Sequence, residues 1–269
     1  MTFDFKVVIP ARYGSTRLPA KPLLQIGGYP MIQWVVAAAL RSGASEVLVA
    51  TDDARVARVA VDPTSSRSLA VMTRADHLSG TDRIYEVAQL RTWPDSTIVV
   101  NVQGDEPLLP PRLIQQVAAL LHAHPSAHLA TLCTPVRSIQ ELMDPNVVKV
   151  VMRSDGAALY FSRAPIPWHR DGAQQGLSSQ TSIQGAYRHL GIYAYRVSAL
   201  REITALPASD LELTEKLEQL RALQAGMALM VAVAEEVPGV GVDTEEDLER
   251  VRAAVAVSGV RLSTSGESN

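Results

Sequence analysis

The chain alternates short apolar runs with segments of helical pattern. The runs are rich in valine and isoleucine and carry few polar residues, which is typical of strands buried on both faces of a sheet. They are FKVVI at Phe5, EVLVA at Glu46, TIVVNV at Thr97, VVKVVM at Val147, LGIYAY at Leu190 and LMVAVA at Leu229. With helices between them, they predict an α/β fold, a three-layer sandwich around a mostly parallel, mixed sheet.

Four segments show apolar residues at the spacing of an amphipathic helix. Thr244 directly precedes the last of them and is its expected N-cap. The expected inward stripes are Met31, Val35 and Ala38 in residues 31–42; Leu113, Val117 and Leu120 in 111–123; Leu213, Leu217 and Leu220 in 211–223; and Leu248, Val251 and Val255 in 245–255.

Composition and charge narrow the class of protein. The 269 residues are 47% apolar, which is enough for one α/β domain with a large core. The formal net charge of −3 leaves no overall basic field, so nucleic-acid binding is not expected. Apolar runs are too short to span a membrane, so we expect a cytoplasmic protein without membrane insertion. Cys133 lies in the strand-like ATLCTPV and is expected in the core.

The loop after the first run has an unusual composition. The stretch VVIPARYGSTRLPAKPL, from Val7, combines prolines and small residues with three cations. In open α/β sheets, ligands bind beyond the carboxyl ends of strands, which is where this loop lies. Arg12, Arg17 and Lys21 can supply charge-assisted donors, and Gly14 with Ser15 lets backbone N–H groups approach an anion. The loop therefore suits a polyphosphate, although it matches neither the P-loop nor the dinucleotide-binding pattern.

Acidic residues follow other strand-like runs. Gln103, Gly104, Asp105 and Glu106 end the run at Thr97, where a pair of carboxylates beside a glycine suits a magnesium ion that also binds substrate phosphates. Asp243 precedes the last helix and either completes this metal site or caps that helix. Asp52 also follows a strand, but there we expect a helix cap.

Two further segments have competing interpretations. Residues 170–182 have loop composition and form either a flap over a site or a plain surface loop. HAHPSAH holds three histidines, His122, His124 and His128, without partners at zinc-ligand spacing, so a solvated surface patch is expected.

Seven motifs occur in a fixed order: PARYGSTRLPAKPL, TRADHLSGTDR, NVQGDEP, ALYFSRAPIPW, RHLGIYAYR, LEQLR and GVDTEEDLERV. Together they closely resemble the motifs of the 3-deoxy-manno-octulosonate (KDO) cytidylyltransferases, also called CMP-KDO synthetases. The resemblance implies transfer of CMP from CTP to KDO for the lipopolysaccharide core, with Mg²⁺ as cofactor and a homodimer as the assembly. It also implies a single domain over residues 1–255 that resembles nucleotide-sugar transferases. Its nucleotide-binding core would comprise 1–130 and 226–255, and 131–225 would form a smaller sugar-binding and dimerisation lobe, while 256–269 reads as a flexible tail.

The resemblance also assigns roles to residues. Arg12, Lys21 and Asp105 would be catalytic, and Asp105 with Asp243 would bind the metal. The nucleotide would contact Arg12, Gly14, Ser15, Arg17, Lys21, Arg74, Ser79, Gly80 and Thr81. The sugar would contact Gln103, Arg163, His189, Tyr193, Glu218 and Gln219. Among these, Arg163 is the best candidate cation for the sugar carboxylate.

Two other functions stay open at this point. One is a cytidylyltransferase for another 2-keto sugar acid, such as a sialic acid or 8-amino-KDO, although YGSTRLPAKPL and RHLGIY favour KDO. The other is a non-catalytic subunit that binds sugar nucleotides, against which the presence of Lys21, Asp105 and Asp243 argues.

Overall fold

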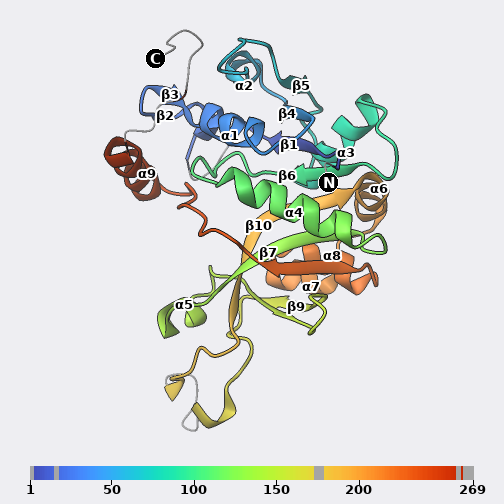
Figure 1. Cartoon of the computed structure of the whole chain (residues 1–269), viewed down its shortest axis with the longest axis vertical. Helices are drawn as coiled ribbons and strands as arrows, with labels where there is room; N and C mark the ends of the chain where they lie inside the picture. The colour runs from blue at the N-terminus through green and yellow to red at the C-terminus, as the bar shows by residue number, and fades with distance from the viewer. Residues whose placement is uncertain (1–2, 15–17, 173–178, 259–261, 263–269) are drawn as a thin grey trace.

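A computed structural model describes residues 3–14, 18–172, 179–258 and 262 (Figure 1). These residues form one nine-stranded sheet and a separate two-stranded hairpin. The strands are β1 (Lys6–Pro10), β2 (Gln25–Ile26), β3 (Tyr29–Pro30), β4 (Glu46–Thr51), β5 (Ala70–Met72), β6 (Ile98–Asn101), β7 (Leu129–Pro135), β8 (Lys149–Met152), β9 (Ala158–Ser162), β10 (Tyr187–Arg196) and β11 (Leu229–Val233). All six apolar runs lie in strands, as predicted.

The sheet is mixed and mostly parallel. Its order is β11-β7-β10-β6-β1-β4-β5, with β8 and β9 continuing from β10. Strand β1 pairs in parallel with β4 and β6, whereas β10 is antiparallel to β6 and β7. Because β1 and β6 are parallel neighbours, the loops that follow them leave the same edge of the sheet.

Helices cover both faces, which confirms the α/β layers. Helices α1, α2 and α4 bury their apolar residues on one face, and α3, α6 and α8 bury theirs on the other. The helices are α1 (Met31–Leu40), α2 (Ala54–Val59), α3 (Gly80–Leu90), α4 (Pro111–Ala123), α5 (Ile139–Met143), α6 (Val197–Ala205), α7 (Asp210–Glu215), α8 (Gln219–Gln224) and α9 (Glu245–Ser258), with short 3₁₀ turns at Lys21–Leu23 and Arg170–Gly172.

Three of the four predicted helices are confirmed. Helices α1, α4 and α9 bury the expected stripes, except that Leu120 is only partly buried. Thr244 caps α9, because its hydroxyl accepts from the backbone N–H of Asp247 while the Asp247 carboxylate accepts from Thr244.

The prediction of a single helix over 211–223 is wrong. The chain leaves the helical conformation at Lys216, which has a left-handed backbone with φ 55° and ψ 47°, so α7 and α8 are separate. Leu217 and Leu220 are buried as expected, but Leu213 is 51% exposed. Apolar spacing alone does not reveal a break of three residues, 216–218, of this kind.

The expected division between core and lobe does not coincide with a break in the sheet. Strand β10 and most of β7 fall within 131–225, and both lie inside the main sheet beside β6 and β11. The part that projects below it in Figure 1 comprises α5, β9 and the connection that leads to β10. At the other end, α9 continues to Ser258 with its last three residues exposed, whereas Leu262 is buried, so the described part of 256–269 includes both exposed and packed residues.

The structure also describes Cys133 and the three histidines of HAHPSAH. Cys133 is fully buried, and burial raises the pKa of its thiol to about 12. The three histidines of HAHPSAH act separately: His122 stacks on Phe3, His124 bonds to the carbonyl of Leu120, and His128 accepts from Ala228. None of the helices formed by the described residues has the length and apolar character needed to cross a membrane.

Candidate active site

A cleft of about 350 Å³ opens where β1 and β6 end. We call it the strand-end cleft. Its lining comes from the first loop, the loop after β6 and the segment before α9: Pro10, Ala11, Arg12, Gly14, Lys21, Pro22, Gln103, Gly104, Asp105 and Asp243. Gly104 is needed for this arrangement, because a Cβ there would lie 3.0 Å from the carbonyl oxygen of Pro10. The predicted cation loop and the predicted carboxylates therefore meet at one place.

Lys21 is the centre of the strand-end cleft. Its Nζ lies 2.6 Å from Oδ2 of Asp105 and 3.1 Å from Oδ1 of Asp243. The Lys21 side chain is only 13% exposed. The backbone supports the contact, because Val242 donates to the carbonyl of Asp105 at 2.9 Å. Asp243 thus faces the cleft, while Thr244 caps α9.

The two carboxylates fit a magnesium ion in their chemistry. Both offer oxygen ligands at the mouth of the cleft, and Mg²⁺ commonly takes one or two protein carboxylates together with substrate phosphates. No cluster of three or more potential metal-binding side chains occurs among the described residues. A metal here would therefore depend on substrate oxygens to complete its coordination.

A second cleft, of about 490 Å³, adjoins the first through Asp105 and Asp243. It is lined by Glu106, which the sequence placed in the carboxylate pair after β6, and by Arg188, which sequence reasoning overlooked. Burial, with the charge of neighbouring Asp105, raises the pKa of Glu106 to about 7. Arg188 lies 3.5 Å from Glu141. The only sequence signal for Arg188 was its position beside His189, a residue that was singled out.

Five of the predicted residues form a polar wall on the face covered by α3 and α8: Thr81, His189, Tyr193, Glu218 and Gln219. His189 packs edge-on against Phe161 at 5.0 Å, and its Nε2 lies 3.0 Å from Oγ1 of Thr131. Burial lowers the pKa of His189 to about 3, so its ring is neutral. Burial also raises the pKa of Tyr193 well above its ordinary value.

The other half of the polar wall joins α3 to α8. Thr81 is 3% exposed, and its hydroxyl interacts with the carboxylate of Glu218, whose pKa is raised by burial. Nε2 of Gln219 is buried and has no hydrogen-bond partner among the described residues. An unsatisfied buried amide of this kind is uncommon and favours a polar ligand group at this point.

Arg163 is engaged elsewhere. Its Nε donates to the carbonyl of Glu215 at 2.7 Å and its Nη1 to the carbonyl of Pro145 at 2.9 Å. The Glu215 carboxylate also accepts from the backbone N–H of Arg163 at 2.9 Å. In this structure the guanidinium thus fastens the start of the lobe connection to α7, and its expected contact with a sugar carboxylate stays a prediction.

Most of the residues expected around the nucleotide base contact neighbours within their own segment of the chain. Arg74 pairs with Asp76 on the surface, and Ser79 caps α3 in a capping box with Asp82. Gly80 is the first residue of α3. Ser15 and Arg17, also expected at the nucleotide, lie outside the described residues.

The cap predicted at Asp52 is wrong by one residue. Asp53 caps α2 by accepting from the N–H of Arg55, whereas Asp52 lies 3.0 Å from the fully buried guanidinium of Arg83. Two adjacent aspartates after a strand look alike in sequence, and only the direction of each side chain separates their roles.

The cleft and the polar wall can be compared with known proteins. Residues 6–230 match the profile of the family described as Cytidylyltransferase. The 3-deoxy-manno-octulosonate cytidylyltransferase of Thioalkalivibrio sulfidiphilus is 54% identical over 92% of this chain and 97% of its own length. The enzyme of the same name from Nitrosococcus oceani is 53% identical over 93% and 95%.

A solved structure agrees with the sequence relatives. It is that of CMP:2-keto-3-deoxy-manno-octonic acid synthetase complexed with CTP, which is 44% identical and superposes with a TM-score of 0.84 over 95% of this chain and 100% of the other. The similarity thus includes β1, β6 and the loops that form the strand-end cleft. By sequence and by fold, the chain belongs to the 3-deoxy-manno-octulosonate cytidylyltransferase family.

Proposed function

We propose that this protein transfers CMP from CTP to KDO and releases pyrophosphate, as a step in building the lipopolysaccharide core. The observation that carries the proposal is the cluster of Lys21 with Asp105 and Asp243 in a cleft that Arg12 also lines. Cations for a triphosphate and carboxylates for a metal meet there. The CTP named in the related solved structure fits this chemistry.

In the proposed reaction, the anomeric hydroxyl of KDO attacks the α-phosphorus of CTP. A new oxygen–phosphorus bond forms to the sugar, and the bond to the β-phosphate oxygen breaks, so pyrophosphate leaves. Arg12 and Lys21 hold the phosphates and neutralise charge on their oxygens, which is the main contribution proteins make to phosphoryl transfer. The reaction needs no protein nucleophile.

Asp105 and Asp243 would hold Mg²⁺ beside the phosphates. When bound, the ion supplies positive charge that polarises the phosphate oxygens and helps to orient the two substrates. Lys21 keeps both carboxylates turned toward the cleft through its contacts at 2.6 and 3.1 Å. Removal of divalent metal with EDTA is therefore expected to abolish turnover, and added Mg²⁺ to restore it.

The sugar would lie against the polar wall and Gln103. Neutral His189, Tyr193 and the unsatisfied amide of Gln219 can exchange hydrogen bonds with its hydroxyls. Arg163 is the proposed cation for the carboxylate, because its bonds to two carbonyls use two of its five N–H donors and leave others for the ligand.

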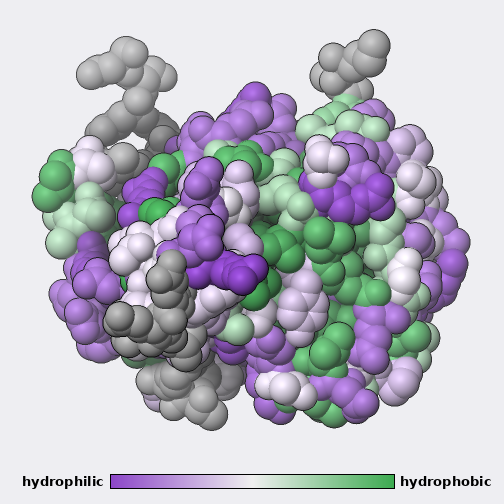
Figure 2. All heavy atoms as spheres, turned by 90° about the horizontal axis from the view of Figure 1, so that it is seen from below, coloured by the Kyte–Doolittle hydropathy of each residue, from purple (hydrophilic) through white to green (hydrophobic). Residues whose placement is uncertain are grey.

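We also propose that the protein works as a homodimer in the cytoplasm, where CTP is available. Exposed leucines on β9 and α7 support the dimer: Leu159 is 58% exposed, Leu211 38% and Leu213 51%. Figure 2 shows apolar surface on the side where Figure 1 places these elements. Light scattering of the purified chain measures its mass and tests this assembly.

The direct test is to measure pyrophosphate release from CTP with Mg²⁺, offering KDO, 8-amino-KDO and a sialic acid in parallel. Turnover with KDO far above the others is expected. Preference for another sugar would keep the roles in the strand-end cleft and overturn those at the polar wall. Release with none of the three would favour a non-catalytic sugar-nucleotide-binding subunit.

A further inference from the structure

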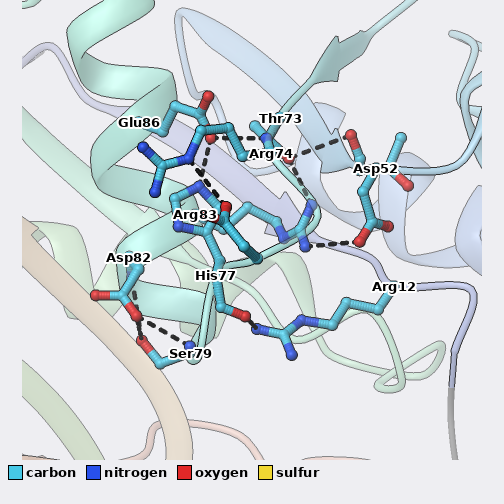
Figure 3. A network of polar contacts seen from close by, with 11 residues as sticks. Arg12, Asp52, Thr73, Arg74, His77, Ser79, Asp82, Arg83 and Glu86 are labelled. Carbon is cyan, nitrogen blue, oxygen red and sulfur yellow. Dashed lines mark hydrogen bonds and ion pairs between the residues drawn. The ribbon is translucent and has the colours of Figure 1, made fainter.

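Arg12 makes a contact that its sequence position does not suggest. Its Nη2 donates to the backbone carbonyl of His77 at 2.6 Å, which joins the first loop to the loop between β5 and α3 (Figure 3). A guanidinium has five N–H donors in a fixed plane, so one bond to a carbonyl sets its direction and leaves others for a phosphate. The carbonyl of His77 thus orients Arg12 within the strand-end cleft.

The side chain of His77 holds that carbonyl in place. Its Nε2 makes a short hydrogen bond to Oε2 of Glu86 on α3, and the same oxygen accepts from the backbone N–H of Arg74 at 3.0 Å. The His77 side chain is 8% exposed and that of Glu86 is 20% exposed. One carboxylate therefore ties two points of a short loop to a helix.

Both ends of this loop are anchored as well. At its start, the buried Arg83 donates to Oγ1 of Thr73 at 2.5 Å and pairs with Asp52. At its end, Ser79 and Asp82 form the capping box of α3. With both ends fixed, the contact of His77 with Glu86 is what remains to determine where the middle of the loop lies.

We infer that His77 and Glu86 are positioning residues for the nucleotide, an inference that rests on the proposed function. Neither side chain is required to touch the substrate. Glu86 holds the imidazole of His77, the fixed loop presents its carbonyl to Arg12, and Arg12 is thereby aimed at the triphosphate before CTP binds. Ordering Arg12 in advance spares CTP the entropy cost of doing so.

The size of the effect follows from the cost of ordering one long side chain at an interface. Releasing Arg12 is expected to raise the Kd for CTP about three- to tenfold. Because the lost contact acts equally before and during the reaction, KM for CTP should rise while kcat stays within about twofold. The KM for KDO should not change, because the polar wall is separate from this loop.

The loop provides matched variants. His77→Ala removes the anchor, whereas His77→Gln keeps an N–H that can reach Glu86 and should restore most of the affinity. Glu86→Ala removes the same contact from the helix side, together with the contact of Glu86 to the backbone N–H of Arg74. Asp76→Ala is the control, because Asp76 lies in the same loop but is 72% exposed and pairs with the exposed side chain of Arg74. Arg12→Ala, alone and combined with His77→Ala, completes a double-mutant cycle.

The experiment is calorimetric titration of the whole protein with CTP and Mg²⁺ in the absence of KDO. We expect weaker binding for His77→Ala and Glu86→Ala, binding within about twofold of wild type for Asp76→Ala, and no added loss from His77→Ala once Arg12 is absent. Wild-type affinity in folded His77→Ala, or full additivity with Arg12→Ala, would overturn the inference alone. Failure of the wild-type protein to bind CTP would overturn the proposed function and this inference with it.

Discussion

The strand-end cleft and the polar wall differ in the charge and the burial of their polar side chains. The cleft contains charged side chains. Lys21 there contacts the carboxylates of Asp105 and Asp243, which are 37% and 57% exposed. The wall buries groups that burial keeps neutral, such as His189 and Tyr193, among aromatic rings. In the proposed reaction, the charges that would meet a triphosphate stay near water, where ion pairs contribute little to stability. The proposed contacts with sugar hydroxyls would instead use neutral groups held by packing.

The largest expected effect lies in the cleft. Asp105→Asn removes a carboxylate from the contact with Lys21 and from the proposed metal site. We expect kcat for pyrophosphate release to fall about 10²- to 10³-fold, as for the loss of one group that stabilises transition-state charge. Because the pair is partly exposed, the free energy of unfolding should change by less than about 1 kcal/mol in urea denaturation.

Asp155→Asn is the matched control for this change. Asp155 pairs with Arg153 at 2.8 Å, and both side chains are more than half exposed. The control should leave turnover unchanged. Near-wild-type turnover in Asp105→Asn would show that the charged cleft is not the place where charge is stabilised, and the contrast with the polar wall would lose its basis.

The next prediction compares a buried polar side chain, Lys149, with an exposed one. Lys149 is fully buried, and its ammonium donates to the carbonyls of Asp144 at 2.9 Å, Val147 and Arg163 at 2.7 Å. Lys149→Met keeps the length of the side chain but leaves three carbonyls without this donor. We expect the free energy of unfolding to fall by about 2–3 kcal/mol in urea.

Arg153→Met provides the comparison for Lys149→Met, because it removes an exposed cation from a surface pair. It should change stability by less than about 0.5 kcal/mol. Equal effects of the two substitutions would mean that water replaces the Lys149 ammonium. The buried ammonium of Lys149 would then contribute no more to the free energy of unfolding than the exposed guanidinium of Arg153.

The same contrast explains what sequence reasoning could find. The cleft was predictable because Lys21 and Asp105 lie in the loops that follow β1 and β6, and the carboxyl ends of parallel neighbours share an edge. The polar wall combines Thr81 with Glu218, which are distant in the chain, and its assignment depended on family resemblance. No local pattern brings such residues together.

Other features could not be recognised from the local sequence. The role inferred for His77 combines its backbone carbonyl, which every residue has, with a side-chain contact to Glu86, so nothing within TRADHLSGTDR distinguishes it. Arg163 was chosen for its charge, yet the structure uses that charge on two backbone carbonyls. A charge in the sequence predicts a need for a partner but does not identify that partner.

A pH-dependent effect sharpens the account of the polar wall. Burial lowers the pKa of His189 to about 3, below its unfolded value near 6.5. Between about pH 6.5 and pH 3, His189 is therefore protonated in the unfolded chain and neutral in the folded chain. As the pH falls through this range, the free energy of unfolding decreases by about 1.4 kcal/mol for each pH unit because of His189. His189→Gln should flatten the stability profile by this amount between pH 6 and 4. If the stability profiles of the wild type and His189→Gln ran parallel, the imidazole would have an ordinary pKa and water would reach the polar wall.

The smallest expected effect tests the break that shapes the wall. Lys216 separates α7 from α8 with a left-handed backbone, which costs a residue with a Cβ about 1 kcal/mol. Lys216→Gly removes this cost but makes the unfolded chain more flexible, so a net stabilisation of at most about 1 kcal/mol is expected in urea denaturation. The break lets Leu217 and Glu218 turn toward the core although Leu213 is exposed.

Thr214→Gly gives the opposite sign and makes this small effect interpretable. Thr214 is exposed within α7, where glycine costs about 0.5–1 kcal/mol. If the free energy of unfolding falls in Thr214→Gly and rises in Lys216→Gly, the end of α7 lies between these two positions. Destabilisation of similar size at both would favour one continuous helix, which would turn Glu218 and Gln219 away from the positions seen here and remove them from the polar wall.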